Sequence, residues 1–255
     1  YFQGKEENFF LAMIEPPVKP NLEDLLPREY IYILDVSGSM RGFPLDVSKA
    51  IIGSMLSTMR SNDYFNILLF AGNNQTLSPT PVAVNKENIQ KAQDWLTHFS
   101  GGGSTQLLPA LKSAMQLPKK EGVSRSIAVV TDGLVLVEVE TFELIRNSLG
   151  DANLFTYGIG SSVNRYILEG MAHSGRGESF IVTSKDEALV EGAKFANYIL
   201  NPLLTDIEIS FDGIETYDIS PLSQPDLFAS RPIVVYGKYK GEADGTLTVR
   251  GKTAG

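Results

Sequence analysis

The chain has 255 residues, a net charge of −8 and no cysteine. The length predicts one large domain, alone or with a smaller companion. The acidic charge argues against a nucleic-acid or anionic-membrane surface, and the lack of cysteine excludes disulfides, zinc–thiolate sites and thiol catalysis. No apolar run approaches the roughly 20 residues that a transmembrane helix needs.

Residues 1–4 read Tyr-Phe-Gln-Gly and look like the remnant of a protease site from an expression tag. We therefore exclude them from fold reasoning, and we expect the natural N-terminus and any signal peptide to be missing. Residues 5–27 hold a short apolar strand at residues 9–14. Four prolines then favour an extended connector between residues 16 and 27.

The central feature is an uninterrupted apolar run at residues 30–34, which is typical of a strand buried on both faces of a parallel sheet. Strands and helices alternate after it. Further strands are predicted at 64–71, 126–131, 154–159 and 180–182, and helices near 44–59, 85–96, 107–117, 142–149, 163–171 and 185–200. This alternation predicts an α/β domain with a doubly wound, mostly parallel sheet over residues 28–200.

Residues 201–255 have a different pattern and predict a smaller β-rich domain. Apolar and polar residues alternate there, and Asp-Gly turns at residues 212–213 and 244–245 suggest two hairpins. Two hairpins alone make only a marginal sheet. We therefore expect residues 9–14 to pair with this region, so that the α/β domain is an insertion within a β-rich domain.

A group of oxygen-bearing side chains follows the predicted strands. Asp35, Ser37 and Ser39 alternate directly after the first strand, so in an extended segment they point the same way. Asp132 follows a later strand, and the glycines at 101–103 let the backbone come close to the site and place Thr105 at its rim. In an open doubly wound sheet, ligands bind outside the carboxyl ends of the strands, where the strand order reverses.

These side chains suit a hard divalent cation such as Mg2+, Mn2+ or Ca2+. Two carboxylates and three neutral hydroxyls leave such a cation short of donor charge. An Asp or Glu from a protein partner could fill the open position. The residues therefore predict a metal-dependent protein-binding site.

At these residues the sequence resembles the von Willebrand factor type A family. The metal-ion-dependent adhesion site of that family combines D-x-S-x-S with a distant Thr and a distant Asp, which read here Asp35, Ser37, Ser39, Thr105 and Asp132. The resemblance implies that the two serines and the threonine hold the metal directly and that the two aspartates act largely through water. The loop before Thr105 carries one extra residue, Ser104, as a rival ligand.

The flanks resemble inter-alpha-trypsin inhibitor heavy chains and their bacterial relatives. The residues that carry this likeness lie at 9–17, 35–45 and 225–228. The resemblance implies a non-enzymatic adhesion module, extracellular or in the cell envelope or periplasm. It also implies that the helix at 185–200 shifts when a partner's carboxylate reaches the metal.

Two other functions remain open from the residues. A magnesium-dependent phosphohydrolase also places an acid after the first strand, but its chemistry needs a second carboxylate where Ser37 stands. A purely structural domain, with a metal that only stabilises the loops, is the other alternative. Metal-dependent partner binding would separate the adhesion module from the structural domain.

Overall fold

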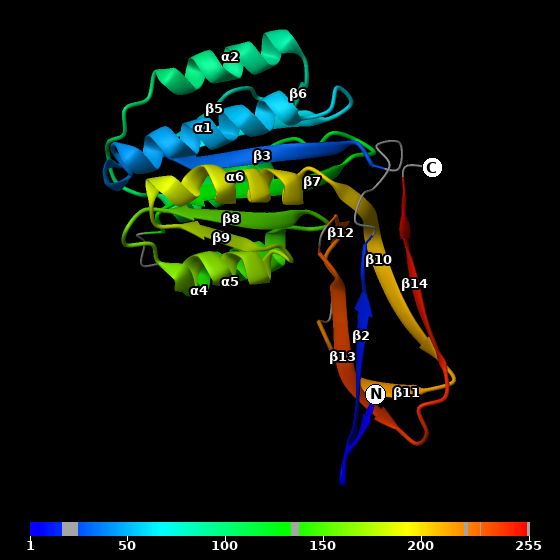
Figure 1. Cartoon of the computed structure of the whole chain (residues 1–255). Coiled ribbons are helices and arrows are strands. Elements are labelled where there is room, and N and C mark those ends of the chain that lie inside the picture. Colours follow the sequence, from blue (N-terminus) through cyan, green and yellow to red (C-terminus); the bar gives the residue numbers. More distant parts are fainter. Residues whose placement is uncertain (17–24, 134–137, 222–223, 230, 254–255) are drawn as a thin grey trace. The chain divides into compact units, whose positions relative to one another are not determined.

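The computed structural model describes residues 1–16, 25–133, 138–221, 224–229 and 231–253. Most of the predicted connector, residues 17–24, lies outside this range. The chain divides into two compact units, one made of Pro27–Leu200 and the other of Tyr1–Leu26 with Asn201–Gly255 (Figure 1).

The larger unit is built on one sheet with the strand order β5-β4-β3-β7-β8-β9, and β6 also pairs with β4. Its strands are β3 (Arg28–Asp35), β4 (Tyr64–Phe70), β5 (Asn74–Thr76), β6 (Val82–Ala83), β7 (Ser124–Thr131), β8 (Asn153–Ile159) and β9 (Ser179–Val182). The strands β4, β3, β7, β8 and β9 are parallel to one another, whereas β5 and β6 run antiparallel to β4. Every residue of β3 is buried, as expected for a strand covered on both faces.

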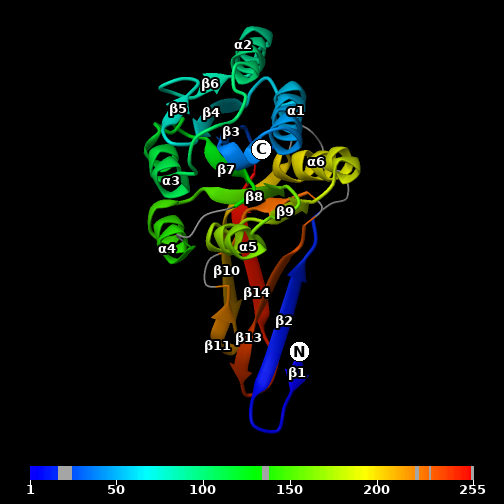
Figure 2. The same ribbon diagram turned by 90° about the vertical axis from the view of Figure 1, so that its left-hand side faces the viewer.

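Helices cover both faces of this sheet. They are α1 (Phe43–Thr58), α2 (Lys86–Thr97), α3 (Leu107–Gln116), α4 (Glu138–Ser148), α5 (Arg165–Ser174) and α6 (Lys185–Ile199). On one face, the Tyr30 hydroxyl donates to the Ile199 carbonyl at 3.2 Å, which holds the end of α6 against β3. On the other face, apolar residues of β3, β4, β7 and β8 form one buried cluster with residues of α3, α4 and α5. Figure 2 shows α1 and α6 on one side of the sheet and α3 and α4 on the other. The predicted α/β class is therefore confirmed.

Local signals explain where two helices begin. Pro44 lies in the first turn of α1, where a missing N–H costs nothing. The Asn85 side chain accepts a 2.8 Å hydrogen bond from the Asn88 N–H and caps α2. None of the described helices is long and apolar enough to cross a bilayer.

The strand order places the switch point between β3 and β7. The chain leaves β3 for β4 on one side, and β7 then joins β3 on its other side. Leu34 is in register with Val130 in this parallel pair. The next residues, Asp35 and Thr131, therefore end their strands side by side at the carboxyl edge of the sheet, where ligands of such folds bind.

The smaller unit contains two antiparallel sheets. One has the order β1-β2-β13-β11 and the other β12-β10-β14. Their strands are β1 (Phe2–Gln3), β2 (Asn8–Ile14), β10 (Pro202–Asp212), β11 (Glu215–Ser220), β12 (Leu227–Phe228), β13 (Ile233–Lys240) and β14 (Thr246–Lys252). β2 pairs with β13 along its whole length, from Asn8 to Ile14.

The two predicted hairpins are wrong, although their strands exist. β10 pairs with β14, and β11 pairs with β13, so the chain crosses to the other sheet at each Asp-Gly turn. Gly213 and Gly241 supply the positive φ angles, +78° and +75°, in these two connections. The crossing lets the two sheets bury a shared apolar interior, where the rings of Phe10 and Phe211 meet at 4.9 Å.

Candidate metal site

Asp35 ends β3 with its carboxylate fully buried. Its Oδ1 accepts a 2.8 Å hydrogen bond from the Ser37 N–H, which turns the chain directly after the strand. Its Oδ2 accepts a 2.6 Å hydrogen bond from the Thr131 hydroxyl.

The environment of Asp35 raises the pKa of its carboxyl group. Loss of hydration on burial is the main cause, and the nearby charge of Asp132 adds to the rise. Hydrogen bonds from Ser37 and Thr131 act in the opposite direction. The ionised carboxylate is therefore held at an energetic cost that a bound cation would offset.

Ser37 and Ser39 present their hydroxyls to each other in the turn that follows Asp35. Their Oγ atoms are 3.2 Å apart, the first side chain being buried and the second exposed. Two neighbouring ligands of an octahedral Mg2+, each about 2.1 Å from the ion, lie about 3 Å apart. The two serine oxygens therefore have the separation of adjacent ligands of one cation.

The glycine-rich loop is tied to this turn by backbone hydrogen bonds in both directions. The Gly102 N–H donates to the Val36 carbonyl at 2.8 Å, and the Gly38 N–H donates to the Gly103 carbonyl at 3.1 Å. A side chain at Gly101 would place its Cβ 3.3 Å from the Ser37 carbonyl oxygen. The loop therefore needs glycine to approach the turn this closely, as the sequence predicts.

Thr105 follows this loop directly before α3 and is partly buried. The adjacent Gln106 N–H donates to the Ala71 carbonyl at 3.1 Å, which anchors the segment to the end of β4. The rival ligand Ser104 is exposed, and its Oγ lies 3.6 Å from the position that a Cβ on Gly72 would take. Ser104 therefore faces the loop after β4.

Asp132 directly follows β7 and is 5% exposed. Its backbone carbonyl accepts a 3.1 Å hydrogen bond from the Asn164 N–H at the start of α5. The preceding Thr131 hydroxyl also accepts from the Gly133 N–H at 3.0 Å, which shapes the turn around Asp132. The loops after β3 and β7 are thus joined through the Thr131–Asp35 hydrogen bond.

The donor chemistry of this edge fits a hard cation. The structure places the turn that carries Asp35, Ser37 and Ser39 beside the end of β7, which Asp132 follows, and hydrogen bonds tie the glycine loop before Thr105 to that turn. Within the described residues, no group of three or more His, Cys, Asp and Glu side chains could hold a metal. A cation here would therefore depend on hydroxyls and water as well as carboxylates.

Sequence reasoning missed two residues that shape the site. The Thr131 hydroxyl fixes the orientation of the Asp35 carboxylate, and the adjacent Thr-Asp pair at the end of a predicted strand was the available signal. Arg41 donates from Nε to the Gly101 carbonyl at 2.9 Å and so holds the glycine loop. No pattern in the sequence indicates that second contact.

Comparisons with known proteins agree with this architecture. The family model of the von Willebrand factor type A domain matches residues 29–181. Inter-alpha-trypsin inhibitor heavy chain H3 of Bos taurus is 27% identical over 247 residues, which cover 92% of this chain and 27% of that protein. A von Willebrand factor A domain-containing protein of Dictyostelium discoideum is 25% identical over 209 residues, covering 82% and 22%. The chain thus spans about a quarter of the length of these relatives.

Solved structures show the same fold. A von Willebrand factor type A protein from Catenulispora acidiphila superposes with a TM-score of 0.73 at 13% identity, over 100% of this chain and 72% of that one. The ArnB paralog VWA2 from Sulfolobus acidocaldarius gives a TM-score of 0.61 at 17% identity, over 99% and 67%. Since the family model covers more than half of the residues, the chain belongs to the von Willebrand factor type A domain family.

Proposed function

We propose that the chain is a divalent-metal-dependent protein-binding module that captures an acidic side chain of a partner. In this proposal Ser37, Ser39 and Thr105 bind the cation directly, and Asp35 and Asp132 act through water. Mg2+ is the expected ion, and Mn2+ or Ca2+ could replace it. When bound, the cation supplies a positive charge that attracts a carboxylate.

The observation that carries the proposal is the pair of serine oxygens 3.2 Å apart, next to the buried carboxylate of Asp35. Burial disfavours the charge of that carboxylate, and the hydrogen bonds from Ser37 and Thr131 offset this only in part. A nearby cation would stabilise the buried negative charge.

Other residues of the site would hold the ligands in position. Thr131 and the Ser37 N–H hold Asp35 in one orientation. Arg41 and the backbone hydrogen bonds of the glycine loop hold the segment before Thr105 against the turn that carries the two serines. The ligands are thereby positioned before a cation or a partner arrives, which lowers the entropic cost of binding.

Only two of the five side chains carry a negative charge. They neutralise a divalent cation only if both are ionised, and the water-mediated contacts of the aspartates weaken that neutralisation. The cation therefore keeps a high affinity for an additional anionic oxygen. A partner's Asp or Glu would supply that oxygen and make binding depend on the metal.

Calorimetric titration with Mg2+ and with Mn2+ tests the first half of the proposal. We expect one site in the unaltered chain and no site in a Ser37→Ala, Ser39→Ala double variant. A Ser57→Ala, Thr58→Ala variant at the distant end of α1 serves as the matched control. Equal metal binding by the serine double variant and the unaltered chain would refute the ligand assignment.

Capture of partners from the native surface, with and without EDTA, tests the second half. We expect the chain to retain at least one protein that EDTA releases and that the double variant does not bind. Partners retained equally in EDTA would instead support a structural role for any metal. Hydrolysis of phosphate esters that requires Mg2+ and Asp35 would support the phosphohydrolase reading and contradict our proposal.

The setting that we propose is extracellular or in the cell envelope or periplasm. The support comes from the likeness to inter-alpha-trypsin inhibitor heavy chains and from a protein of the same fold, at 21% identity, whose name describes it as an aerotolerance-related membrane protein from Bacteroides fragilis. A module with no cysteine is compatible with such an oxidising setting, because it has no thiol to oxidise.

A further inference from the structure

The strand β2 lies near one edge of its sheet and is only partly covered on its outer side. Its inner neighbour β13 pairs with all seven residues, Asn8–Ile14. The outer neighbour β1 pairs with only two of them, through the contacts Phe2–Phe9 and Gln3–Asn8. Among the described strands, none pairs with residues 10–14 on that outer side. Five residues of backbone are thus available for further pairing.

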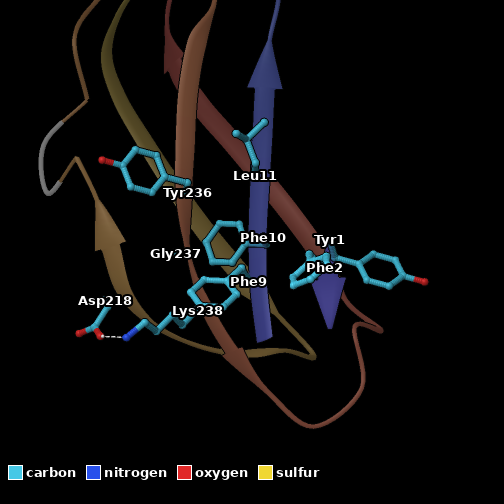
Figure 3. A pocket seen from close by; sticks show the side chains of 9 residues that line it. All are labelled: Tyr1, Phe2, Phe9, Phe10, Leu11, Asp218, Tyr236, Gly237 and Lys238. Carbon is cyan, nitrogen blue, oxygen red and sulfur yellow. Dashed lines mark ion pairs between the residues drawn. The ribbon is translucent and has the colours of Figure 1, made fainter. Parts of the chain in front are cut away.

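The face of the sheet beside this edge exposes several large apolar side chains. Phe9, Leu11 and Met13 alternate along β2 with exposed fractions of 41%, 61% and 53%, and Tyr236 on β13 is 53% exposed opposite Leu11. A groove of about 550 Å³ is lined by Phe2, Phe9, Leu11 and Tyr236, and the Asp218–Lys238 ion pair also lines it (Figure 3). A contiguous exposed apolar patch on a soluble protein marks an interaction surface.

The edge also lacks the features that normally prevent pairing between molecules. Residues 8–14 contain neither a charged residue nor a proline, whereas natural edge strands are usually protected by such residues. The opposite edge of the same sheet shows this protection. There, β11 carries Glu215 and Asp218, both exposed and both in ion pairs with lysines of β13.

We propose that β2 is a self-association edge that pairs antiparallel with β2 of a second copy of this chain. A two-fold axis at Ala12 would place Leu11 opposite Met13 of the second copy, and Phe10 opposite its Ile14. This register keeps outward side chains opposite outward ones and inward opposite inward ones. A second copy fits because the uncharged segment then meets itself, and no like charges face each other.

The short strand β1 competes for the same edge. In the proposed register, Glu15 of the second copy falls opposite Phe9, the position that Phe2 takes in the monomer. Residues 2 and 3, which pair there, belong to the segment that resembles a tag remnant. That such a segment pairs with β2 indicates that this edge can accept an added strand. Removing them should free the rest of β2.

Sedimentation velocity on the chain with and without residues 1–4 tests the competition. We expect the shortened chain, which starts at Lys5, to dimerise, with a dissociation constant about tenfold lower than that of the full chain. A shortened chain that stays monomeric up to about 100 μM overturns the proposal. Dimers of equal strength in both chains would overturn it too, since β1 would then not block the edge.

Two charged variants of the shortened chain test the register. Leu11→Lys and Met13→Glu should each weaken the dimer at least about tenfold, because each buries a lone charge against an apolar side chain. Mixing the two variants should restore a heterodimer, because Lys and Glu then face each other while the second Leu11–Met13 contact stays apolar. Thr246→Lys, at an exposed position on β14 in the other sheet, is the matched control and should leave the dimer unchanged.

The outcomes of the variant experiment are separable from misfolding. Circular dichroism and thermal unfolding of each variant should match those of the shortened chain, since Leu11 and Met13 are more than half exposed. If the mixture fails to form heterodimers while both variants remain folded, the proposed register is wrong. If Thr246→Lys breaks the dimer and Leu11→Lys does not, the interface lies on the other sheet.

Discussion

At the scale of single residues, burying the Asp35 carboxylate has an energetic cost in the metal-free fold. A fully buried carboxylate receives hydrogen bonds from Ser37 and Thr131, yet burial still raises its pKa. The ionised group therefore destabilises the metal-free fold most at a pH above that raised pKa, and the penalty shrinks as the pH falls from there toward the pKa of the unfolded chain. The sign follows from the folded pKa lying above the unfolded one.

Replacing this carboxylate by its neutral isostere should separate stability from metal binding. We expect Asp35→Asn to be as stable as the metal-free parent, or more stable, at neutral pH, because the amide keeps the acceptor for the Ser37 N–H and cannot ionise. We also expect it to lose metal binding. Asp35→Ala should lose about 1–3 kcal/mol, because it leaves two buried donors without an acceptor. Urea unfolding and calorimetry measure the two effects.

Asp94→Asn is the control for that pair of variants, because Asp94 is exposed on α2. It should change neither property. Metal binding by Asp35→Asn at the affinity of the parent would show that Asp35 takes no part in the site.

The affinity for Mg2+ should fall as the pH is lowered, starting at a higher pH than an ordinary aspartate would give. Metal binding needs the ionised carboxylate, and the raised pKa of Asp35 means that protons compete for it earlier. Calorimetry across a pH series measures the affinity, and buffers of different ionisation enthalpy measure the protons released. An affinity that does not change down to the ordinary aspartate range would contradict this account.

At the scale of elements, the glycine loop and the turn after β3 act as one unit. Gly101 has a φ of +84°, and a Cβ there would lie 2.9 Å from Cγ of Arg41 and 3.3 Å from the Ser37 carbonyl oxygen. Gly101→Ala should therefore cost about 1 kcal/mol in backbone strain and also displace the turn that carries the serine ligands. We expect weaker Mg2+ binding, measured by calorimetry.

Gly122 offers a matched control for this element. Its φ is +72°, but a Cβ there would meet nothing within 4 Å. Gly122→Ala should carry the same backbone strain with no effect on the metal. Equal affinities in the Gly101→Ala and Gly122→Ala variants would show that the loop does not position the ligands.

The sequence predicts the elements of this protein better than their pairing. The buried strand at residues 30–34 and the cap at Asn85 follow from local patterns and are present in the structure. The Asp-Gly turns also predict strands correctly, but they do not form hairpins. Whether two strands pair across such a turn depends on the packing of both sheets, and the Phe10–Phe211 contact joins residues about 200 positions apart in the chain.

In the candidate metal site, too, local features are predictable from the sequence and long-range contacts are not. The oxygen-bearing residues after β3 and β7 are predictable, because alternation and strand ends place them on one edge. The full burial of Asp35 and the contact with Thr131 are not, since they depend on the register between two strands that are distant in sequence. The contact of Arg41 is not predictable either, because its partner is the backbone carbonyl of Gly101, which no side-chain pattern marks.

At the scale of the whole molecule, two compact units with separate interiors should respond differently to metal. We expect Mg2+ at 100 times its dissociation constant to stabilise the unit of residues 27–200 by about 2.7 kcal/mol. Scanning calorimetry should show this as a shift of one transition. Phe211→Ala, in the interior of the other unit, should lower only the transition that does not respond to metal. Equal shifts of both transitions by Mg2+ would contradict a site confined to the larger unit.

The central claim is that one cation binds where the loops after β3 and β7 meet the glycine loop. A crystal structure of the chain grown with Mn2+ tests it most directly, because the anomalous signal locates the ion without assumptions about its ligands. We predict a single strong peak in contact with the hydroxyl oxygens of Ser37, Ser39 and Thr105, with waters between the ion and the two aspartates. A Thr105 side chain turned away from the serines, with no peak between them, would contradict the account.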